Sequence, residues 1–183
     1  MPFTNNLFLD ALTDTVRQAL APHLARLELK QHQILYDVRK AVTKVYFAID
    51  AVVSLVVPLS TGQAVEVAMV GRDGVIGAAA ALDGRPSLSR AVVQIGGQSL
   101  ACDIALFKSA LAKLPDLQPL VAAHEQVKFS QAQQSAACNA THDLESRLAR
   151  WLLRAADLHG GNELPFTQEF LAQMLGGVAP AFQ

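Results

Sequence analysis

The sequence has few residues of the kinds that build metal and disulfide sites. Its 183 residues include two cysteines, Cys102 and Cys138, which lie far apart and form no CxxC pair. This scarcity excludes a disulfide framework, a zinc ribbon and a four-cysteine iron–sulfur site. The five histidines show neither HxH nor HExxH spacing. We therefore expect no metal site and no cofactor.

Excess charge and long apolar runs are also missing. Lys and Arg number 15 against 16 Asp and Glu, a net charge of -1, so the chain lacks the overall positive charge typical of nucleic-acid-binding proteins. The opening residues, MPFTNNLFLDAL, have neither the basic start nor the continuous apolar segment of a signal peptide. No stretch is long enough for a membrane-spanning helix. The sequence predicts a reduced, cytoplasmic protein with no membrane partner.

The sequence does contain enough apolar material for a core, since hydrophobic residues make up 51% of it. Leucines at near-helical intervals predict helix within residues 6–29, with Thr13 as the N-cap of a short helix. Short runs rich in Val, Ile and Tyr follow and end at turn signals: ILYDV, KVYFAI, AVVSLVVPL, AVEVAMV, SRAVVQI and SLACDI. Such runs favour an antiparallel sandwich or barrel. The Ala-rich run GVIGAAAAL predicts a turn of helix between them.

The pattern is helical from Ile104 onwards. One helix is predicted over 104–114, ended by Pro115, and a long helix from about 117 to 158. The long helix carries a heptad-like stripe of two interleaved rows: Leu120, Val127, Gln134, Thr141 and Leu148, and His124, Gln131, Cys138 and Glu145. We interpret the stripe as the seam of a homodimer; the alternative is a helix packed on its own domain. After a break at 159–162, Thr167 is expected to cap a short helix over 168–175.

Three passages together resemble one known family. VGRDGVIG (70–77) resembles the approach to the phosphate-binding cassette of Crp/Fnr-family transcription regulators. LESRLARWL (144–152) resembles the end of their dimerisation helix, and FTQEFLAQMLG (166–176) the first helix of their helix-turn-helix. The resemblance implies a mainly β plus α chain. Its parts are a double-stranded β-helix (jelly-roll) effector domain over 1–114, a long dimerisation helix over 115–158, and the start of a truncated winged helix-turn-helix over 159–183.

The resemblance also implies an effector pocket, formed by Gly71, Ile76, Gly77, Ala78, Ser89 and Arg90. Cyclic-nucleotide-binding members follow the glycine that matches Gly77 with Glu, which accepts from the ribose hydroxyl, and hold the cyclic phosphate with an Arg-Ser pair. Here Ala78 follows Gly77, and the pair reads Ser89-Arg90. Alanine accepts no hydrogen bond, and adjacent residues of a strand face opposite sides. Cyclic AMP is therefore not expected, and the effector is an unknown small molecule.

The DNA-binding part departs from the family as well. The resemblance assigns Thr167, Gln168 and Glu169 to the remnant of the helix-turn-helix. A recognition helix would follow Gly176, but GVAPAFQ contains a proline and neither Lys nor Arg, the residues that supply most DNA affinity. We expect this chain to lack the recognition helix, through a frameshift, a genuine stop or the boundary of an expressed fragment.

Three functions are weighed. The main prediction is a homodimeric Crp/Fnr-like transcription regulator that binds DNA in its complete form and senses an effector through the β-roll. The alternative is a stand-alone effector-binding and dimerisation module without DNA binding. The third is a jelly-roll enzyme. Metal-dependent oxygenases need two histidines and a carboxylate on one metal, and no histidine lies between His32 and His124, so we expect no enzymatic activity.

One basic strip remains open to two interpretations. Arg147, Arg150 and Arg154 lie at helical spacing in the predicted long helix. They form either a strip that contacts a DNA backbone or a solvated face paired with Glu145 and Asp157.

Overall fold

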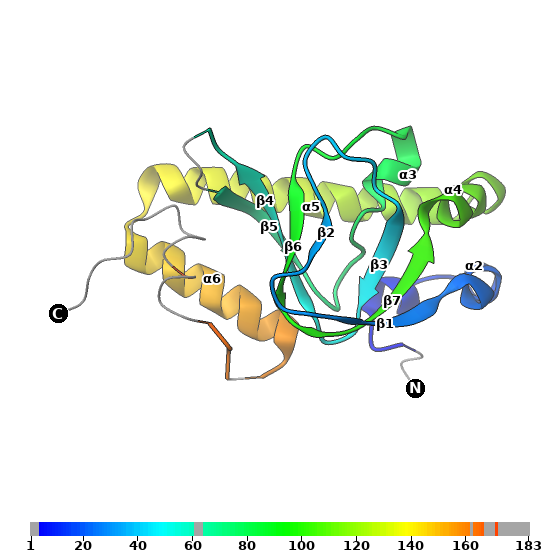
Figure 1. Cartoon of the computed structure of the whole chain (residues 1–183), viewed down its shortest axis with the longest axis horizontal. Helices are drawn as coiled ribbons and strands as arrows, with labels where there is room; N and C mark the ends of the chain where they lie inside the picture. Colours follow the sequence, from blue (N-terminus) through cyan, green and yellow to red (C-terminus); the bar gives the residue numbers. More distant parts are fainter. Residues whose placement is uncertain (1–3, 61–63, 162, 167–170, 172–183) are drawn as a thin grey trace.

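The computed structural model describes residues 4–60, 64–161, 163–166 and 171 (Figure 1). Within these residues, seven strands form two antiparallel sheets, of order β1-β7-β3 and β2-β6-β4-β5. Helices α2 (Asp14–Leu20) and α4 (Ile104–Lys113) lie at one end of this β-roll, and the long helix α5 (Leu117–Thr141) runs along it (Figure 1). The antiparallel sandwich or barrel predicted from the short strand runs is confirmed.

Six strands fall within the six runs predicted from the sequence, apart from two residues at the start of β7. Their bounds are β2 Ile34–Tyr36, β3 Lys44–Ala48, β4 Val52–Pro58, β5 Ala64–Val70, β6 Arg90–Ile95 and β7 Gly97–Asp103. Between β5 and β6 lies α3 (Ala79–Asp83), the helical turn that the Ala-rich run predicts. It ends at Gly84, whose φ of 71° is the left-handed conformation that glycine adopts without strain.

The N-terminal segment is only partly helical. Helices α1 (Leu7–Asp10) and α2 (Asp14–Leu20) form as expected, and the Thr13 hydroxyl caps α2 by accepting from the Val16 N–H. A 3-10 turn, Ala21–His23, follows, and Ala25–Leu29 form strand β1 beside β7. The prediction of helix up to residue 29 is therefore wrong. Pairing with β7 outweighs the leucine spacing, which is a local signal only.

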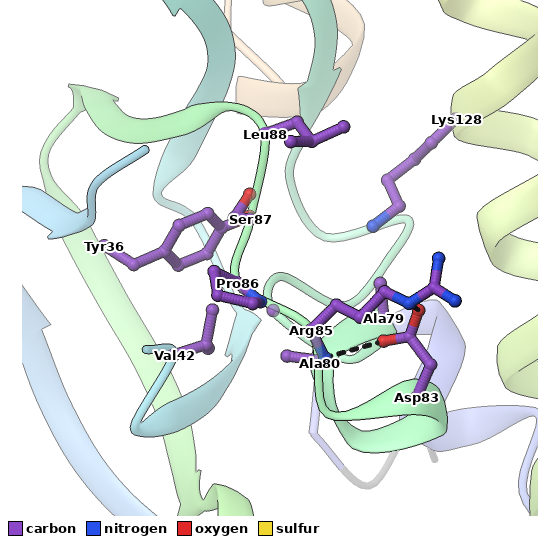
Figure 2. A pocket seen from close by; sticks show the side chains of 11 residues that line it. Tyr36, Val42, Ala79, Ala80, Asp83, Arg85, Pro86, Ser87, Leu88 and Lys128 are labelled. Carbon is purple, nitrogen blue, oxygen red and sulfur yellow. Dashed lines mark hydrogen bonds and ion pairs between the residues drawn. The ribbon is translucent and has the colours of Figure 1, made fainter. Parts of the chain in front are cut away.

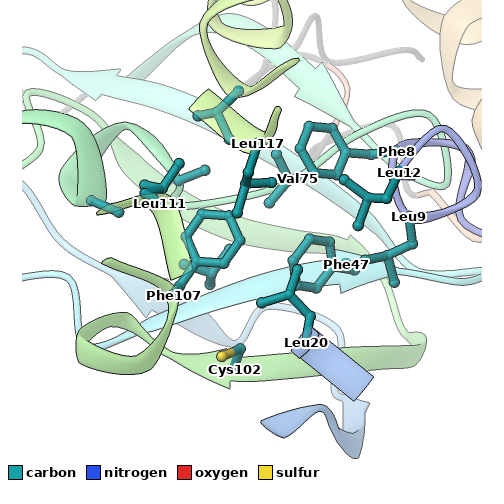
Figure 3. Close-up of a cluster of buried hydrophobic side chains, with 14 of the residues drawn as sticks. Phe8, Leu9, Leu12, Leu20, Phe47, Val75, Cys102, Phe107, Leu111 and Leu117 are labelled. Carbon is teal, nitrogen blue, oxygen red and sulfur yellow. The ribbon is translucent and has the colours of Figure 1, made fainter. Parts of the chain in front are cut away.

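The main core lies between sheet β1-β7-β3 and the surrounding helices (Figure 3). The Phe47 ring lies 6.0 Å from both the Phe8 and the Phe107 ring centroids. Helix α4 (Ile104–Lys113) contributes Phe107, and α5 contributes Leu117 and Val121. All of these side chains are almost fully buried, so this end of α5 is held on its own β-roll by apolar packing.

The predicted helix over 117–158 is two helices. Helix α5 spans Leu117–Thr141 and α6 spans Leu144–His159, with His142 in an extended conformation between them. Asp143 is the N-cap of α6, and its carboxylate accepts from the Ser146 N–H at 2.9 Å. The correction has a local cause, because an Asp N-cap favours a new helix start over continuation.

Helix α6 turns back and packs on the β-roll (Figure 1). An apolar cluster separate from the main core joins α6 to the β-roll, and it consists of Trp151, Ala155, Leu158, Val52, Met69 and Ile95. Apolar and charged residues recur at helical spacing in α6, so one face of the helix is apolar. Burial of this apolar face on β4 and β5 explains why α6 folds back onto the β-roll.

Candidate functional site

A pocket of about 260 Å3 opens between the α3–β6 segment, strand β2 and helix α5 (Figure 2). Its lining residues come from all three elements: Tyr36, Val42, Gly77, Ala79, Ala80, Asp83, Arg85, Pro86, Ser87, Leu88 and Lys128. Figure 2 shows Lys128 and Arg85 on one side of the pocket and Tyr36 and Val42 on the other. One wall therefore carries two cationic side chains and the carboxylate of Asp83, and the opposite wall is mostly apolar.

Backbone conformation shapes this pocket at Gly77. Its φ is 86°, and a Cβ there would lie 2.9 Å from the Lys44 carbonyl oxygen. Glycine is therefore required for the chain to pass between β3 and α3. After α3, the segment Arg85–Leu88 follows the pocket rim, and the Ser87 hydroxyl donates to the Ser89 carbonyl at 2.8 Å.

Lys128 is the side chain through which α5 reaches the pocket. It is 9% exposed, and its Nζ pairs with Glu125 Oε1 at 2.6 Å. Burial by itself would raise the pKa of Glu125, but a hydrogen bond with His124 and the charge of Lys128 lower it. Glu125 is therefore held as the carboxylate that compensates the buried ammonium. Across the pocket, burial raises the pKa of Tyr36, which keeps its hydroxyl neutral.

Of the six residues predicted for the effector pocket, Gly77 alone lines it. Ile76 and Ala78 are fully buried, and the Ile76 backbone forms a bridge with Tyr46. Gly71 lies beneath α6, where a Cβ would approach Leu158 to 3.0 Å. Ser89 and Arg90 do not line the pocket either. The other five predicted residues are therefore not among those that line this pocket.

Arg90 is occupied by another side chain. Its Nε and Nη2 donate to the two carboxylate oxygens of Asp37 at 2.8 and 3.0 Å. This two-pronged pair lowers the pKa of Asp37, chiefly through the hydrogen bonds from Arg90. The Arg90 guanidinium is therefore bound to Asp37 and does not line the pocket.

The two rows of the predicted dimer seam are adjacent on α5 but differ in their exposure. In the second row, His124 Nε2 accepts from the Val75 N–H at 3.3 Å, Gln131 Oε1 accepts from the Met69 N–H at 3.1 Å, and Cys138 is buried. His124 and Gln131 therefore bond to the chain's own β-roll. In the first row, Leu120 is partly buried, whereas Val127, Gln134 and Thr141 are exposed.

Two arginines of α6 bond to other parts of the chain: Arg154 to the β-roll and Arg150 to helix α5. Arg154 pairs with Asp73 and also donates to the Met69 carbonyl, and Arg150 donates to the Ser135 hydroxyl at 3.3 Å. Neither predicted interpretation, a DNA strip or a face paired with Glu145 and Asp157, describes these contacts. The approach of α6 to β5 and to the C-terminal half of α5, which sequence spacing does not encode, creates them.

Sequence reasoning missed Lys128, Arg85 and Tyr36 as pocket residues. A signal existed for Lys128, because Glu125 and Lys128 are the two acidic or basic residues of α5 apart from its histidine and lie three positions apart. A charged pair in a helix of low charge is a candidate for a specific contact. The predicted Thr167, Gln168 and Glu169 lie outside the described residues.

The described residues contain no group of three or more His, Cys, Asp and Glu side chains placed to hold a metal ion. No helix within them is both long and apolar enough to cross a membrane.

The β-roll with an inserted short helix and a following long helix is the fold of cyclic-nucleotide-binding-type regulators. Similar solved structures include a protein from Eubacterium rectale assigned to the Crp/Fnr family (TM-score 0.74, 15% identity, 91% of this chain and 78% of that one). FixK2 from Bradyrhizobium japonicum is another (0.72, 15%, 85% and 79%). A third is the c-di-GMP-responsive global regulator CLP of Xanthomonas campestris (0.71, 12%, 91% and 86%).

These likenesses show that the chain has the fold of Crp/Fnr-family transcription regulators, as its motifs predict. No protein-family model and no curated protein matches the sequence.

Proposed function

We propose that this chain is the effector-binding and dimerising part of a Crp/Fnr-like transcription regulator. The observation that carries the proposal is the position of Lys128. One side chain of the long helix closes the pocket of the β-roll, while the other side of the same helix is open to solvent. A molecule in the pocket therefore contacts the helix that would join two copies.

The proposed dimer contact is a revised seam on α5. Its first row is Val127, Gln134 and Thr141, at intervals of seven residues. The second row of the proposed seam consists of Ala123, Ser130 and Ala137, which are also exposed. It replaces the row of His124, Gln131 and Cys138. Two such rows at alternating spacing of four and three residues match the a and d positions of a coiled coil. The small residues let two helix backbones approach closely.

The seam is tested with Val127→Asp, since Val127 is 54% exposed and a carboxylate there places two like charges at a dimer axis. The wild-type chain is expected to be a dimer by sedimentation equilibrium, and the variant a folded monomer. Phe129→Asp is the matched control. Phe129 is 56% exposed but points about 200° around the helix from Val127, so its variant is expected to stay dimeric. A monomeric wild type, or loss of the dimer in the Phe129 variant alone, contradicts the seam.

A second function, a sensing and dimerisation module that does not itself bind DNA, is favoured by the contacts of α6. Arg150 and Arg154 both bind groups of the chain itself, which takes two cations away from a phosphate backbone. Mobility shift of a random-sequence duplex at low salt tests whether this chain itself contacts DNA. Binding that weakens steeply with added salt contradicts the module, and absence of binding is the result expected for it.

A further inference from the structure

Two cations of different elements border the pocket. Arg85 belongs to the segment after α3, and its guanidinium pairs with Asp83 at 3.6 Å, with both side chains largely exposed. Such solvent-exposed pairs are weak and readily exchanged. Figure 2 places the Arg85 guanidinium on the same side of the pocket as the Lys128 ammonium.

Lys128 differs from Arg85 because it is buried. An ammonium carries three N–H donors, and in the described part of the chain Glu125 is the one carboxylate paired with it. Lys128 lines the pocket, whereas Glu125 does not. The Lys128 side chain therefore contacts both the pocket and a carboxylate of α5 outside it. Donors of a buried ammonium that face a pocket favour an anionic acceptor.

The opposite wall offers no charge. The Tyr36 ring, Val42 and Pro86 lie there, with Leu88 at the rim (Figure 2). The volume of about 260 Å3 is below the ~300 Å3 at which ligand pockets usually begin. Both properties favour a small ligand with one apolar body rather than a nucleotide.

We propose that the pocket binds a small monoanion, namely a carboxylate on an aromatic or branched apolar body. Its acid group lies between Lys128 and Arg85, and its body packs against Tyr36 and Val42. The inference rests on the proposed function, since it names the ligand class of that same pocket. The bound carboxylate competes with Glu125 for the Lys128 ammonium, so ligand binding changes an ion pair of the dimerisation helix.

The test uses benzoate and its uncharged analogue benzamide, titrated into the full chain by isothermal calorimetry. Benzoate is expected to bind at least about tenfold more tightly than benzamide, since a hydrogen bond to a charged partner is lost in the amide. Lys128→Met, which keeps the length and apolar stem of the side chain, is expected to weaken benzoate binding by about tenfold or more. Arg85→Gln is expected to weaken it by a smaller factor.

Lys30→Met is the matched control, because Lys30 is an exposed lysine that does not line the pocket, and its benzoate affinity is expected to equal that of the wild type. Arg85 is exposed, so its variant keeps the test valid if Lys128→Met does not fold. Equal binding of benzamide and benzoate, unchanged affinity in both pocket variants, or no benzoate binding in the millimolar range overturns the inference. A dimer that persists in such a case leaves the proposed function standing, whereas a monomeric wild type contradicts that function whatever benzoate does.

Discussion

Glu66 is a carboxyl group that the fold places in β5 beneath α6. Ser54 Oγ donates to it from the neighbouring strand, and Trp151 of α6 forms a second hydrogen bond. Burial raises the pKa of Glu66 from 4.5 to about 7, and those hydrogen bonds together with the charges of Arg150 and Arg154 oppose the rise. The desolvation penalty exceeds the opposing interactions, so Glu66 titrates near neutral pH.

At the residue scale, this shift predicts that the chain becomes less stable as pH rises from about 4.5 to 7. Folded Glu66 retains its proton in this range, whereas the unfolded chain releases it, so the folded state binds more protons and raising the pH favours unfolding. The shift from 4.5 to about 7 corresponds to a loss of at most about 3 kcal/mol. Urea unfolding at pH 5 and pH 7.5 measures the loss, and Glu66→Gln is expected to abolish most of it. The same pH slope in Glu66→Gln as in the wild type contradicts this assignment.

At the scale of elements, α6 is attached to the β-roll by one face. Trp151, Ala155 and Leu158 are buried, and the Trp151 ring lies 4.8 Å from that of Phe166. Leu153, two positions after Trp151, is 68% exposed. Trp151 therefore marks the face of α6 that packs on the β-roll, and Leu153 marks the face that is exposed to solvent.

Trp151→Ala is expected to release α6 from the sheet, because it removes the largest side chain of the apolar cluster between α6 and the β-roll. Large-to-small changes of buried aromatic residues cost about 3–5 kcal/mol, which is of the order of local unfolding free energies. Amide hydrogen exchange is expected to become faster in α6 and to change little in β3 and β7. Leu153→Ala is the control, with exchange expected to match the wild type. Uniformly faster exchange across the β-roll in Trp151→Ala would show that α6 is part of the main cooperative unit.

At the scale of the whole molecule, Asn6 joins the N-terminal segment to the end of β3 and to the turn at Gly74. Its side-chain amide donates to the carbonyls of Ala48 and Gly74 at 2.8 and 2.9 Å, and its Oδ1 accepts from the Leu9 N–H at 3.0 Å. The residue is fully buried. One side chain therefore caps α1 and satisfies two carbonyl groups that would otherwise be buried without donors.

Asn6→Ala is expected to lower the free energy of unfolding by about 2–3 kcal/mol, since a helix cap is lost and two buried acceptors are left unsatisfied. The midpoint of urea denaturation measures this change. Gln18→Ala provides the comparison, because Gln18 is exposed on α2 and its loss is expected to leave the midpoint unchanged. A midpoint of Asn6→Ala equal to that of the comparison variant would refute the bridging role.

The sequence by itself determined the strand runs, the short helix after Gly77, the Thr13 cap and the overall resemblance to Crp/Fnr regulators. These features depend on side-chain period, turn residues and capping, which act over a few positions. The same local signals predicted a continuous helix from 117 to 158. The sequence nevertheless contains Asp143, the N-cap residue at which the second helix begins.

Only the tertiary structure decided which faces of the helices are covered and which side chains reach the pocket. His124 and Ala123 are neighbours in the sequence, yet one bonds to the β-roll and the other is exposed. Arg90 belongs to the reversed Ser89-Arg90 pair, and its orientation depends on Asp37, 53 residues away. Lys128 reaches the pocket because α5 packs beside the α3–β6 segment. Such contacts join distant parts of the chain, and local sequence patterns carry no information about the distances between those parts.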